Sequence, residues 1–335
     1  LKPVWLKPSS WEVGPLPALA RSSMTNGQAP PKAVRQTVVL GDRIFQCSVH
    51  RARRAPGPGH EVAPPLVVVA GWAMVKEEWG PLTEELSETR DVLAFDNQGI
   101  GGSQDKPEDQ FTLDSWAADV VSLADAVFSP GVRFVALGFS MGSFLVQHLA
   151  VMRPDRVCAI ICVGGQGARK TAVAGKGAFF KHSSKTSATE ANSLEANDER
   201  LRYFYGPGIV EAERPEVWAA HVAADLALRR PAATVAKQFK VLAKADVALA
   251  QIRCPALAMY GSEDCIVPAA NGKLLLPDLA NSVQKDLVLL PGQGHMCWGF
   301  CPLGSGATPL ATRTMAEHIE SFLTAAVEAK PLSKL

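Results

Sequence analysis

The sequence lacks the patterns that mark several common classes of protein. Its seven cysteines are dispersed and include no C-x-x-C pair, and its seven histidines include no H-E-x-x-H motif. Such spacing argues against a disulfide framework and against a zinc ribbon. We therefore expect free thiols in a reducing compartment and no metal site.

Strong net charge and long apolar runs are also missing. Lysine and arginine number 34 against 33 aspartate and glutamate, which gives a net charge of +1. The composition therefore offers no electrostatic reason to expect nucleic acid or an anionic membrane as a partner. The longest apolar run, around Pro65–Ala70, has the length of a strand rather than of a membrane span. We expect a soluble intracellular protein that acts on a small molecule, in an oligomeric state that is left open.

A nucleotide-binding glycine loop is absent as well. Gly99-Ile100-Gly101-Gly102 follows a predicted strand, but Gln104 stands where the third glycine of a dinucleotide loop would be. No helix pattern begins there either, and a helix N-terminus is what such a loop needs to hold a pyrophosphate. We expect no cofactor.

The sequence contains enough hydrophobic residues for a large apolar core. The 335 residues are 47% hydrophobic and 20% charged, enough for one large domain with an insertion or for two ordinary domains. Short apolar runs alternate with helical patterns. The predicted strands are a hairpin of Gln36–Leu40 and Arg43–Val49 around Gly41-Asp42, then Leu66–Ala70, Val92–Phe95, Val132–Leu137, Val157–Val163, Ala256–Tyr260 and Asp286–Leu290. The predicted helices are Leu82–Thr89, Leu113–Phe128, Gly142–Met152, Ala270–Leu279 and Leu310–Ala329. This alternation predicts an α/β fold with buried strands in a mostly parallel sheet and helices on both faces.

The first 34 residues depart from this alternation. They are rich in Pro, Ser and Ala and show no sustained periodicity, so we expect a disordered or surface-packed arm. Because the chain begins at Leu1, we expect its natural start to be missing. The basic residues of this arm could instead be the remnant of a transit peptide, which would place the protein in an organelle.

Residues 164–252 also depart from it, because no strand pattern occurs there. A polar stretch, Ser183–Arg200, precedes helical patterns at Leu201–Tyr205, Pro215–Leu228 and Ala232–Leu242. We expect residues 35–163 and 253–330 to form the core, and residues 164–252 to form a helical cap over the carboxyl edge of the sheet. That edge is where open α/β sheets bind ligands.

The most informative motif is Gly138-Phe139-Ser140-Met141-Gly142. It lies between a predicted strand and a predicted helix, the context of the nucleophile elbow of serine hydrolases. The sharp turn forces the serine into a crowded backbone conformation, and glycines at the flanking positions let strand and helix approach. The helix N-terminus then directs free N–H groups toward the site. We expect Ser140 to be a catalytic nucleophile.

Partners for this serine follow two later strands. Gly261-Ser262-Glu263-Asp264 comes after one and Pro291-Gly292-Gln293-Gly294-His295 after the next. A serine hydroxyl needs a histidine to accept its proton, and the histidine needs a carboxylate to fix its tautomer. We expect His295 as the base and Asp264 as the acid. Glu263 is the alternative acid, and His148 and His318 are the alternative histidines.

An oxyanion hole requires two backbone N–H groups. We expect one from Met141, directly after the nucleophile, and the other from the loop Gly71-Trp72, at Trp72. The Trp72 side chain could also serve as a wall of the pocket. Expected substrate contacts are Gly71, Phe180, Tyr203, Phe204, Tyr205, Trp218 and Trp298. For the aromatic residues of the insertion, among them Phe179, packing within the cap is an equally good explanation.

From about Gln36 to the C-terminal helix the chain resembles the α/β-hydrolase superfamily, in particular its 3-oxoadipate enol-lactonase-like branch. The runs that carry the resemblance are Phe95–Ser103, Gly138–Gly142, Gly261–Asp264, Asn271–Leu275 and Leu290–Met296. Two positions depart from the family pattern. Ala70 stands where a histidine usually precedes the glycine of the oxyanion loop, and Gln98 replaces an arginine, so a charge is lost beside the rim of the pocket.

These observations predict a cofactor-independent serine hydrolase of a small ester, lactone or related acyl compound, acting through an acyl-enzyme. A carbon–carbon bond hydrolase of a β-diketone-like substrate would use the same residues. A ligand-sensing receptor that retains these residues and turns over slowly is the alternative from another class of protein.

Overall fold

The computed structural model describes residues 33–54, 62–167, 172–175, 193–303 and 308–328. Predictions that concern residues 1–32, Phe179 or Phe180 lie outside these residues. The part described forms one eight-stranded sheet in the order β1-β2-β4-β3-β5-β6-β7-β8. β1 pairs antiparallel with β2 and β2 pairs antiparallel with β4, and every later pairing is parallel. The predicted α/β fold with a mostly parallel sheet is confirmed.

The strand bounds agree closely with the sequence patterns. The strands are β1 (Val34–Leu40), β2 (Arg43–His50), β3 (Leu66–Val69), β4 (Val92–Phe95), β5 (Phe134–Phe139), β6 (Val157–Val163), β7 (Ala256–Gly261) and β8 (Lys285–Leu290). Leu40 pairs with Arg43 across the two-residue turn, so the hairpin is confirmed. β8 is not the buried strand that was predicted, because it lies at the edge of the sheet and Leu289 is 45% exposed.

Side chains alternate between two faces of the sheet. In β3, Val67 and Val69 belong to one core cluster, and Leu66 and Val68 belong to the other. Helices α2 (Leu113–Val127), α3 (Met141–Met152) and α9 (Ala270–Asp278) contribute to the first cluster. Helices α1 (Pro81–Leu86) and α10 (Leu310–Leu323) contribute to the second, and α10 ends in a π-helical turn, Thr324–Glu328. Burial of both faces explains why the parallel strands read as continuous apolar runs.

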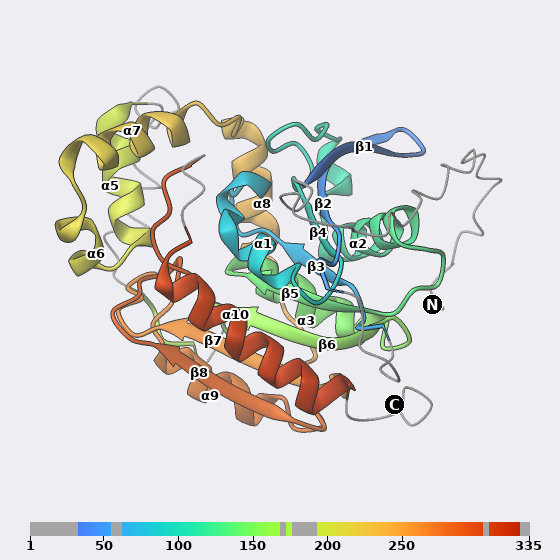
Figure 1. The fold of residues 1–335 in the computed structure, drawn as a ribbon. Coiled ribbons are helices and arrows are strands. Elements are labelled where there is room, and N and C mark those ends of the chain that lie inside the picture. The colour runs from blue at the N-terminus through green and yellow to red at the C-terminus, as the bar shows by residue number, and fades with distance from the viewer. Residues whose placement is uncertain (1–32, 55–61, 168–171, 176–192, 304–307, 329–335) are drawn as a thin grey trace.

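Between β6 and β7 the described chain contains helices and no strand. These are α5 (Leu194–Phe204), α6 (Pro207–Ala212), α7 (Pro215–Leu226), α8 (Ala232–Lys244) and a 3₁₀ turn, Leu249–Gln251. Figure 1 shows α5, α6 and α7 grouped at one end of the molecule, with α8 apart from them and nearer the middle of the sheet. Buried residues of α5 to α7 belong to the same core cluster as the β3 residues Leu66 and Val68.

Two helices of this segment differ from the sequence prediction. α6 was not predicted. α5 begins within the stretch Ser183–Arg200, because Ser193 accepts a hydrogen bond from the Ala196 amide and so caps the helix. The 3₁₀ helices η1 (Lys76–Trp79) and η2 (Glu108–Gln110) were likewise not predicted, since they are too short to show a periodicity.

Candidate active site

Ser140 lies at the junction of β5 and α3 with a left-handed backbone, φ 51° and ψ −113°. Such a conformation costs a residue with a side chain about 1–3 kcal/mol and persists only where surrounding contacts fix it. Two contacts do so here. The Ser140 amide donates to the Val163 carbonyl at 2.8 Å, and the Ser140 carbonyl accepts from the Ser143 amide at 2.9 Å. The hydroxyl of this residue is therefore carried on a sharply turned, fixed backbone.

The two flanking glycines permit close approach of three backbone segments. A Cβ at Gly138 would lie 2.2 Å from the Gly142 carbonyl oxygen, and a Cβ at Gly142 would lie 2.2 Å from the Val69 carbonyl oxygen. Any side chain at either position would push α3 away from β5 or β3. The spacing of glycines around Ser140 thus has a direct steric cause.

Asp264 and His295 are in contact. His295 Nδ1 lies 2.7 Å from Asp264 Oδ2, and both residues are buried, at 1% and 6% exposure. The other carboxylate oxygen of Asp264 accepts from the Ile266 and Val267 amides. Since a carboxylate only accepts, Nδ1 donates, which leaves His295 Nε2 as the acceptor of the neutral ring. Glu263, the alternative acid, is exposed to solvent.

The His295 ring is held near the elbow by its neighbours. Phe139, which precedes Ser140, packs against it at 4.8 Å between ring centroids, and Phe204 packs against it at 5.6 Å. Gly164 has φ +55°, and a Cβ there would lie 3.0 Å from His295 Cε1. Gly164 follows Val163, the residue that binds the Ser140 amide. The fold therefore brings the ends of β5, β6 and β8 together around this ring.

The residues that carry the two predicted oxyanion donors, Met141 and Trp72, belong to segments that adjoin the elbow. Met141 is the first residue of α3, and Trp72 follows Gly71 at the end of β3. A Cβ at Gly71 would lie 2.9 Å from the Phe139 ring, so the loop passes directly beside the elbow. Neither amide, nor the Ser140 hydroxyl, makes a hydrogen bond to another described residue. Hydrogen bonds of catalytic groups are often completed only when substrate binds.

The loop after β3 is bound by the chain around α8. The Trp72 indole Nε1 donates to the Val235 carbonyl at 2.8 Å, and the ring packs against Phe239. Ala73 has φ +58°, the second left-handed residue with a side chain in the described chain. Its amide donates to Gln238 Oε1 at 3.0 Å, and its carbonyl accepts from Arg230 Nε at 2.8 Å.

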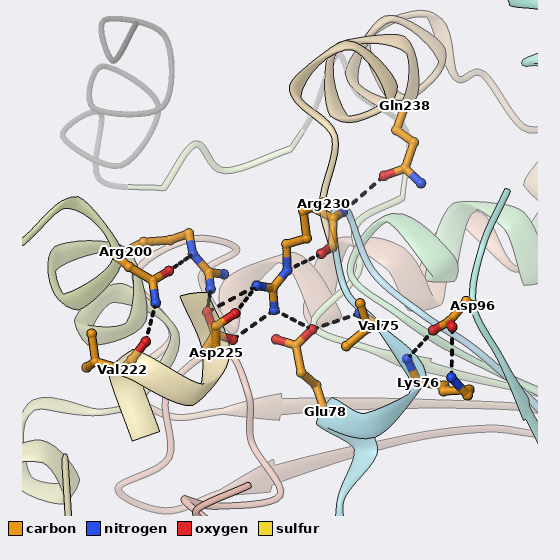
Figure 2. A network of polar contacts seen from close by, with 11 residues as sticks. Val75, Lys76, Glu78, Asp96, Arg200, Val222, Asp225, Arg230 and Gln238 are labelled. Atoms are coloured by element: carbon orange, nitrogen blue, oxygen red, sulfur yellow. Dashed lines mark hydrogen bonds and ion pairs between the residues drawn. The ribbon is translucent and has the colours of Figure 1, made fainter. Parts of the chain in front are cut away.

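Arg230 belongs to a buried ionic network, drawn in Figure 2, which we call the clasp: Glu78, Arg200, Asp225 and Arg230. Arg230 is ion-paired with Glu78 at 2.9 Å and with Asp225 at 2.8 Å, and Asp225 is also paired with Arg200. Burial raises the pKa of the Glu78 carboxyl, although Arg230 opposes it. Burial also disfavours ionised Asp225, but Arg200 and Arg230 outweigh it and lower its pKa to about 2.

The remaining predicted pocket residues occupy different environments. Phe204 contacts His295, and the Tyr203 carbonyl lies 3.6 Å from Cys265 Sγ, one residue after Asp264. Tyr205 and Trp218 are buried and pack on each other at 5.9 Å. Trp298 is 2% exposed and stacks on Trp79 at 5.2 Å. The structure thus brings Phe204 to the histidine and surrounds Tyr205, Trp218 and Trp298 with other rings.

The alternative histidines lie on helices away from the elbow. His148 on α3 contacts Asp114 of α2 at 2.6 Å, and His318 is exposed on α10. Gln98 is 2% exposed and lines a cavity of about 220 Å³ with Arg43, Gln110 and Asp119. None of the three predicted catalytic residues lines that cavity.

Several residues that shape the site were not found from the sequence. The sequence holds a signal for Gly164, because the pair Gly164-Gly165 directly follows a predicted strand. Asn97 donates from Nδ2 to the Ala70 carbonyl at 3.1 Å, and Gln238 and Arg230 bind Ala73. These contacts join segments far apart in sequence and leave no local pattern. Among the residues described, no group of His, Cys, Asp and Glu could hold a metal ion, and no helix has the length and apolarity to cross a membrane.

Comparisons with known proteins agree with this geometry. The family model described as "alpha/beta hydrolase fold" matches residues 64–297. The "Putative carbamate hydrolase RutD" of Enterobacter cloacae is 26% identical over 243 residues, which cover 72% of this chain and 87% of that protein. The 3-oxoadipate enol-lactonase 2 of Acinetobacter baylyi is 28% identical over 198 residues, 58% of this chain and 70% of that one. Among solved structures, the enol-lactonase of Burkholderia xenovorans LB400 superposes with a TM-score of 0.67 at 19% identity, covering 86% of this chain and 100% of that one.

Proposed function

Because the chain belongs to the α/β-hydrolase fold family, we propose that it hydrolyses the ester, lactone or carbamate bond of a small acyl compound through Ser140, His295 and Asp264. The observation that carries the proposal is the left-handed Ser140 between two sterically required glycines. The buried hydrogen bond between Asp264 and His295 supports it further. The relatives named as a carbamate hydrolase and an enol-lactonase support the choice of acyl bonds.

In the proposed mechanism, His295 Nε2 accepts the Ser140 hydroxyl proton as Oγ attacks the carbonyl carbon. The carbonyl oxygen becomes an oxyanion, which accepts hydrogen bonds from the Met141 and Trp72 amides. The tetrahedral intermediate then collapses, and His295 gives its proton to the leaving alcohol or amine, which leaves an acyl-enzyme. Asp264 holds Nδ1–H throughout and stabilises the imidazolium.

Water completes the cycle. His295 Nε2 removes a proton from a water molecule, whose oxygen attacks the acyl carbon. Collapse of the second tetrahedral intermediate expels Ser140 Oγ, which takes the proton back from His295, and releases the acid. For a carbamate whose alcohol leaves, the acid released is a carbamic acid, and for one whose amine leaves it is a carbonic acid monoester. We further propose that residues 164–252 form a cap over this site, supported by the contact of Phe204 with His295.

Labelling with a fluorophosphonate tests the nucleophile. Such a probe forms a covalent bond to an activated serine, so wild type should be labelled and Ser140→Ala should not. Turnover of p-nitrophenyl acetate should fall about 10⁴-fold or more in Ser140→Ala. Ser122→Ala is the matched control, because that hydroxyl only donates to the Ala118 carbonyl on α2. Persistent labelling of Ser140→Ala would contradict the assignment.

A substrate panel tests the bond that is cleaved. Esters of graded acyl length, a lactone, an N-aryl carbamate and a β-diketone should be compared with the same enzyme preparation. Hydrolysis of one or more acyl substrates with loss of activity in Ser140→Ala is expected. Cleavage of the β-diketone alone would instead identify a carbon–carbon bond hydrolase.

A further inference from the structure

The loop that would present the Trp72 amide to the oxyanion is not fixed by its own sequence. Within the loop, the Met74 amide donates to the Gly71 carbonyl at 3.3 Å, which closes a turn. That turn places Ala73 in the left-handed region at φ +58°, where residues with a side chain are strained. The conformation therefore needs contacts from outside the loop.

Those contacts come from the last third of the proposed cap, around α8. Both backbone polar groups of Ala73 are bound by that segment: the amide by Gln238 Oε1 and the carbonyl by Arg230 Nε. The neighbouring Trp72 side chain is bound by it too, through the Val235 carbonyl. The three partners lie 157 to 165 residues further along the chain.

We propose that Gln238 and Arg230 are positioning residues that hold Ala73 left-handed and thereby direct the Trp72 amide toward the oxyanion formed at Ser140. The proposal rests on the proposed hydrolase function. Its physical basis is that the plane of the Trp72–Ala73 peptide and the path of the chain through Trp72 change if Ala73 returns to negative φ. A displaced donor stabilises the transition state less while ground-state binding is retained.

Arg230 is itself immobilised. Its five N–H donors match five acceptors: the Ala73 carbonyl, the Asp225 carbonyl, both Asp225 carboxylate oxygens and Glu78 Oε2. Glu78 Oε2 also accepts from the Val75 amide of the same loop at 2.7 Å. Figure 2 shows the Arg230 side chain between Asp225 and Glu78, with Gln238 apart from these three side chains.

Gln238 is the better residue for a test, because it can be changed without breaking the clasp. It is fully buried at 0% exposure, and Nε2 has no partner among the described residues, so Oε1 alone carries its contact. Gln238→Met keeps the length of the side chain and removes the acceptor. Gln238→Glu keeps an acceptor for the Ala73 amide. Lys240→Met, at an exposed position of α8, is the control for introducing methionine into this helix.

The experiment uses the full chain and measures kcat and KM for p-nitrophenyl acetate, active sites titrated with a fluorophosphonate, and Tm. In Gln238→Met we expect kcat per titrated site to fall about 10- to 100-fold, less than the loss of a whole oxyanion donor, with KM changed less than about threefold. In Gln238→Glu the logarithm of kcat per titrated site should recover at least half of that loss. Lys240→Met should have the kcat and KM of wild type.

A second substitution separates positioning from stability. Glycine adopts positive φ without steric cost, so Ala73→Gly in the Gln238→Met background should restore kcat several-fold. Unchanged kcat per titrated site in Gln238→Met would overturn the proposal, as would failure of Ala73→Gly to restore kcat when Tm is restored. Absence of labelling and turnover in wild type would instead overturn the proposed function, so the two failures are distinguishable.

Discussion

Ser140 and Ala73 are the two described residues with a side chain and a left-handed backbone, and both belong to the candidate active site. Each is fixed by hydrogen bonds with residues of another segment: Ser140 with Val163 of β6, and Ala73 with Gln238 of α8 and with Arg230, which precedes that helix. Strain of this kind stays only where the rest of the structure determines the conformation more strongly than the residue does. In this protein it lies where the proposed chemistry requires fixed donors and a fixed nucleophile.

Substitution of single residues decides which carboxylate, Asp264 or Glu263, is the acid that pairs with His295. Asp264→Asn should lower kcat by about 10⁴-fold with little change in the fold, because the histidine loses control of its tautomer. Glu263→Gln should leave kcat within about twofold, since that side chain is exposed. Steady-state kinetics with p-nitrophenyl acetate and circular dichroism are the measurements. A damaging Glu263→Gln beside a mild Asp264→Asn would assign the acid to Glu263.

Among the elements, α5 and the loop after β8 determine the surroundings of His295. The Met296 amide donates to the Phe204 carbonyl at 2.8 Å, and a Cβ at Gly294 would lie 2.5 Å from the Gly206 amide. Backbone therefore packs directly on backbone where α5 ends. This contact places Phe204 against the histidine while the next residue, Tyr205, enters the core with Trp218. Adjacent aromatic residues consequently have different roles.

Two truncations separate these roles. Phe204→Ala should change the preference among acyl chain lengths by about tenfold and lower Tm only slightly, because Phe204 lies beside His295. Trp218→Ala should cost about 3–5 kcal/mol of stability, because it leaves a cavity in a buried cluster with Tyr205 and Phe300. Kinetics with a series of nitrophenyl esters and urea unfolding measure the two effects. Loss of stability in Phe204→Ala without altered preference would place that ring in the core alone.

At the scale of the whole molecule, the clasp joins segments that are distant in the chain. Glu78 comes from η1, Arg200 from α5, Asp225 from α7 and Arg230 from the link to α8. Two carboxylates balance two guanidinium groups, so the buried charges are compensated. Such a network contributes little when intact and is costly to break at one member, since the partner is then left buried and unpaired. The network thus connects the inserted helices to η1, the segment between β3 and α1.

Substitution of Asp225 tests whether the clasp holds these helices in place. Asp225→Asn should lower the free energy of unfolding by about 3–5 kcal/mol, whereas Asp155→Asn, in an exposed pair with Arg153, should cost less than about 1 kcal/mol. Urea unfolding at pH 7 measures both. Equal, small costs would mean that the clasp does not hold the helices.

The pH dependence of the free energy of unfolding gives a second measurement of how much Asp225 stabilises the fold. The pKa of Asp225 is lowered from 3.8 to about 2, so its ionised form stabilises the fold. This contribution is fully present above pH of about 4 and is lost as pH falls toward 2. Between these values the stability of wild type should fall more steeply than that of Asp225→Asn. Because the Asp225 charge is one cause of the raised pKa of Glu78, the comparison reports the loss of the Asp225 charge together with its effect on Glu78.

The sequence by itself determined the sheet, its flanking helices and the candidate nucleophile. These depend on short-range patterns: buried parallel strands are continuous apolar runs, and the glycines around Ser140 form a motif within one strand–turn–helix unit. The order of Ser140, Asp264 and His295 was also readable, because each follows the end of a predicted strand and parallel strands end at one edge of the sheet.

Only the tertiary structure decided what surrounds those residues. The left-handed Ala73, the contact of Gly164 with His295 and the separation of Phe204 from Tyr205 depend on segments that meet in space. Gln238 reads as an ordinary polar residue of a helix and becomes a buried partner of Ala73 only when α8 packs over a loop 165 positions earlier in the chain. Nothing local encodes such a contact, because its free energy comes from the burial and hydrogen bonding of both segments together.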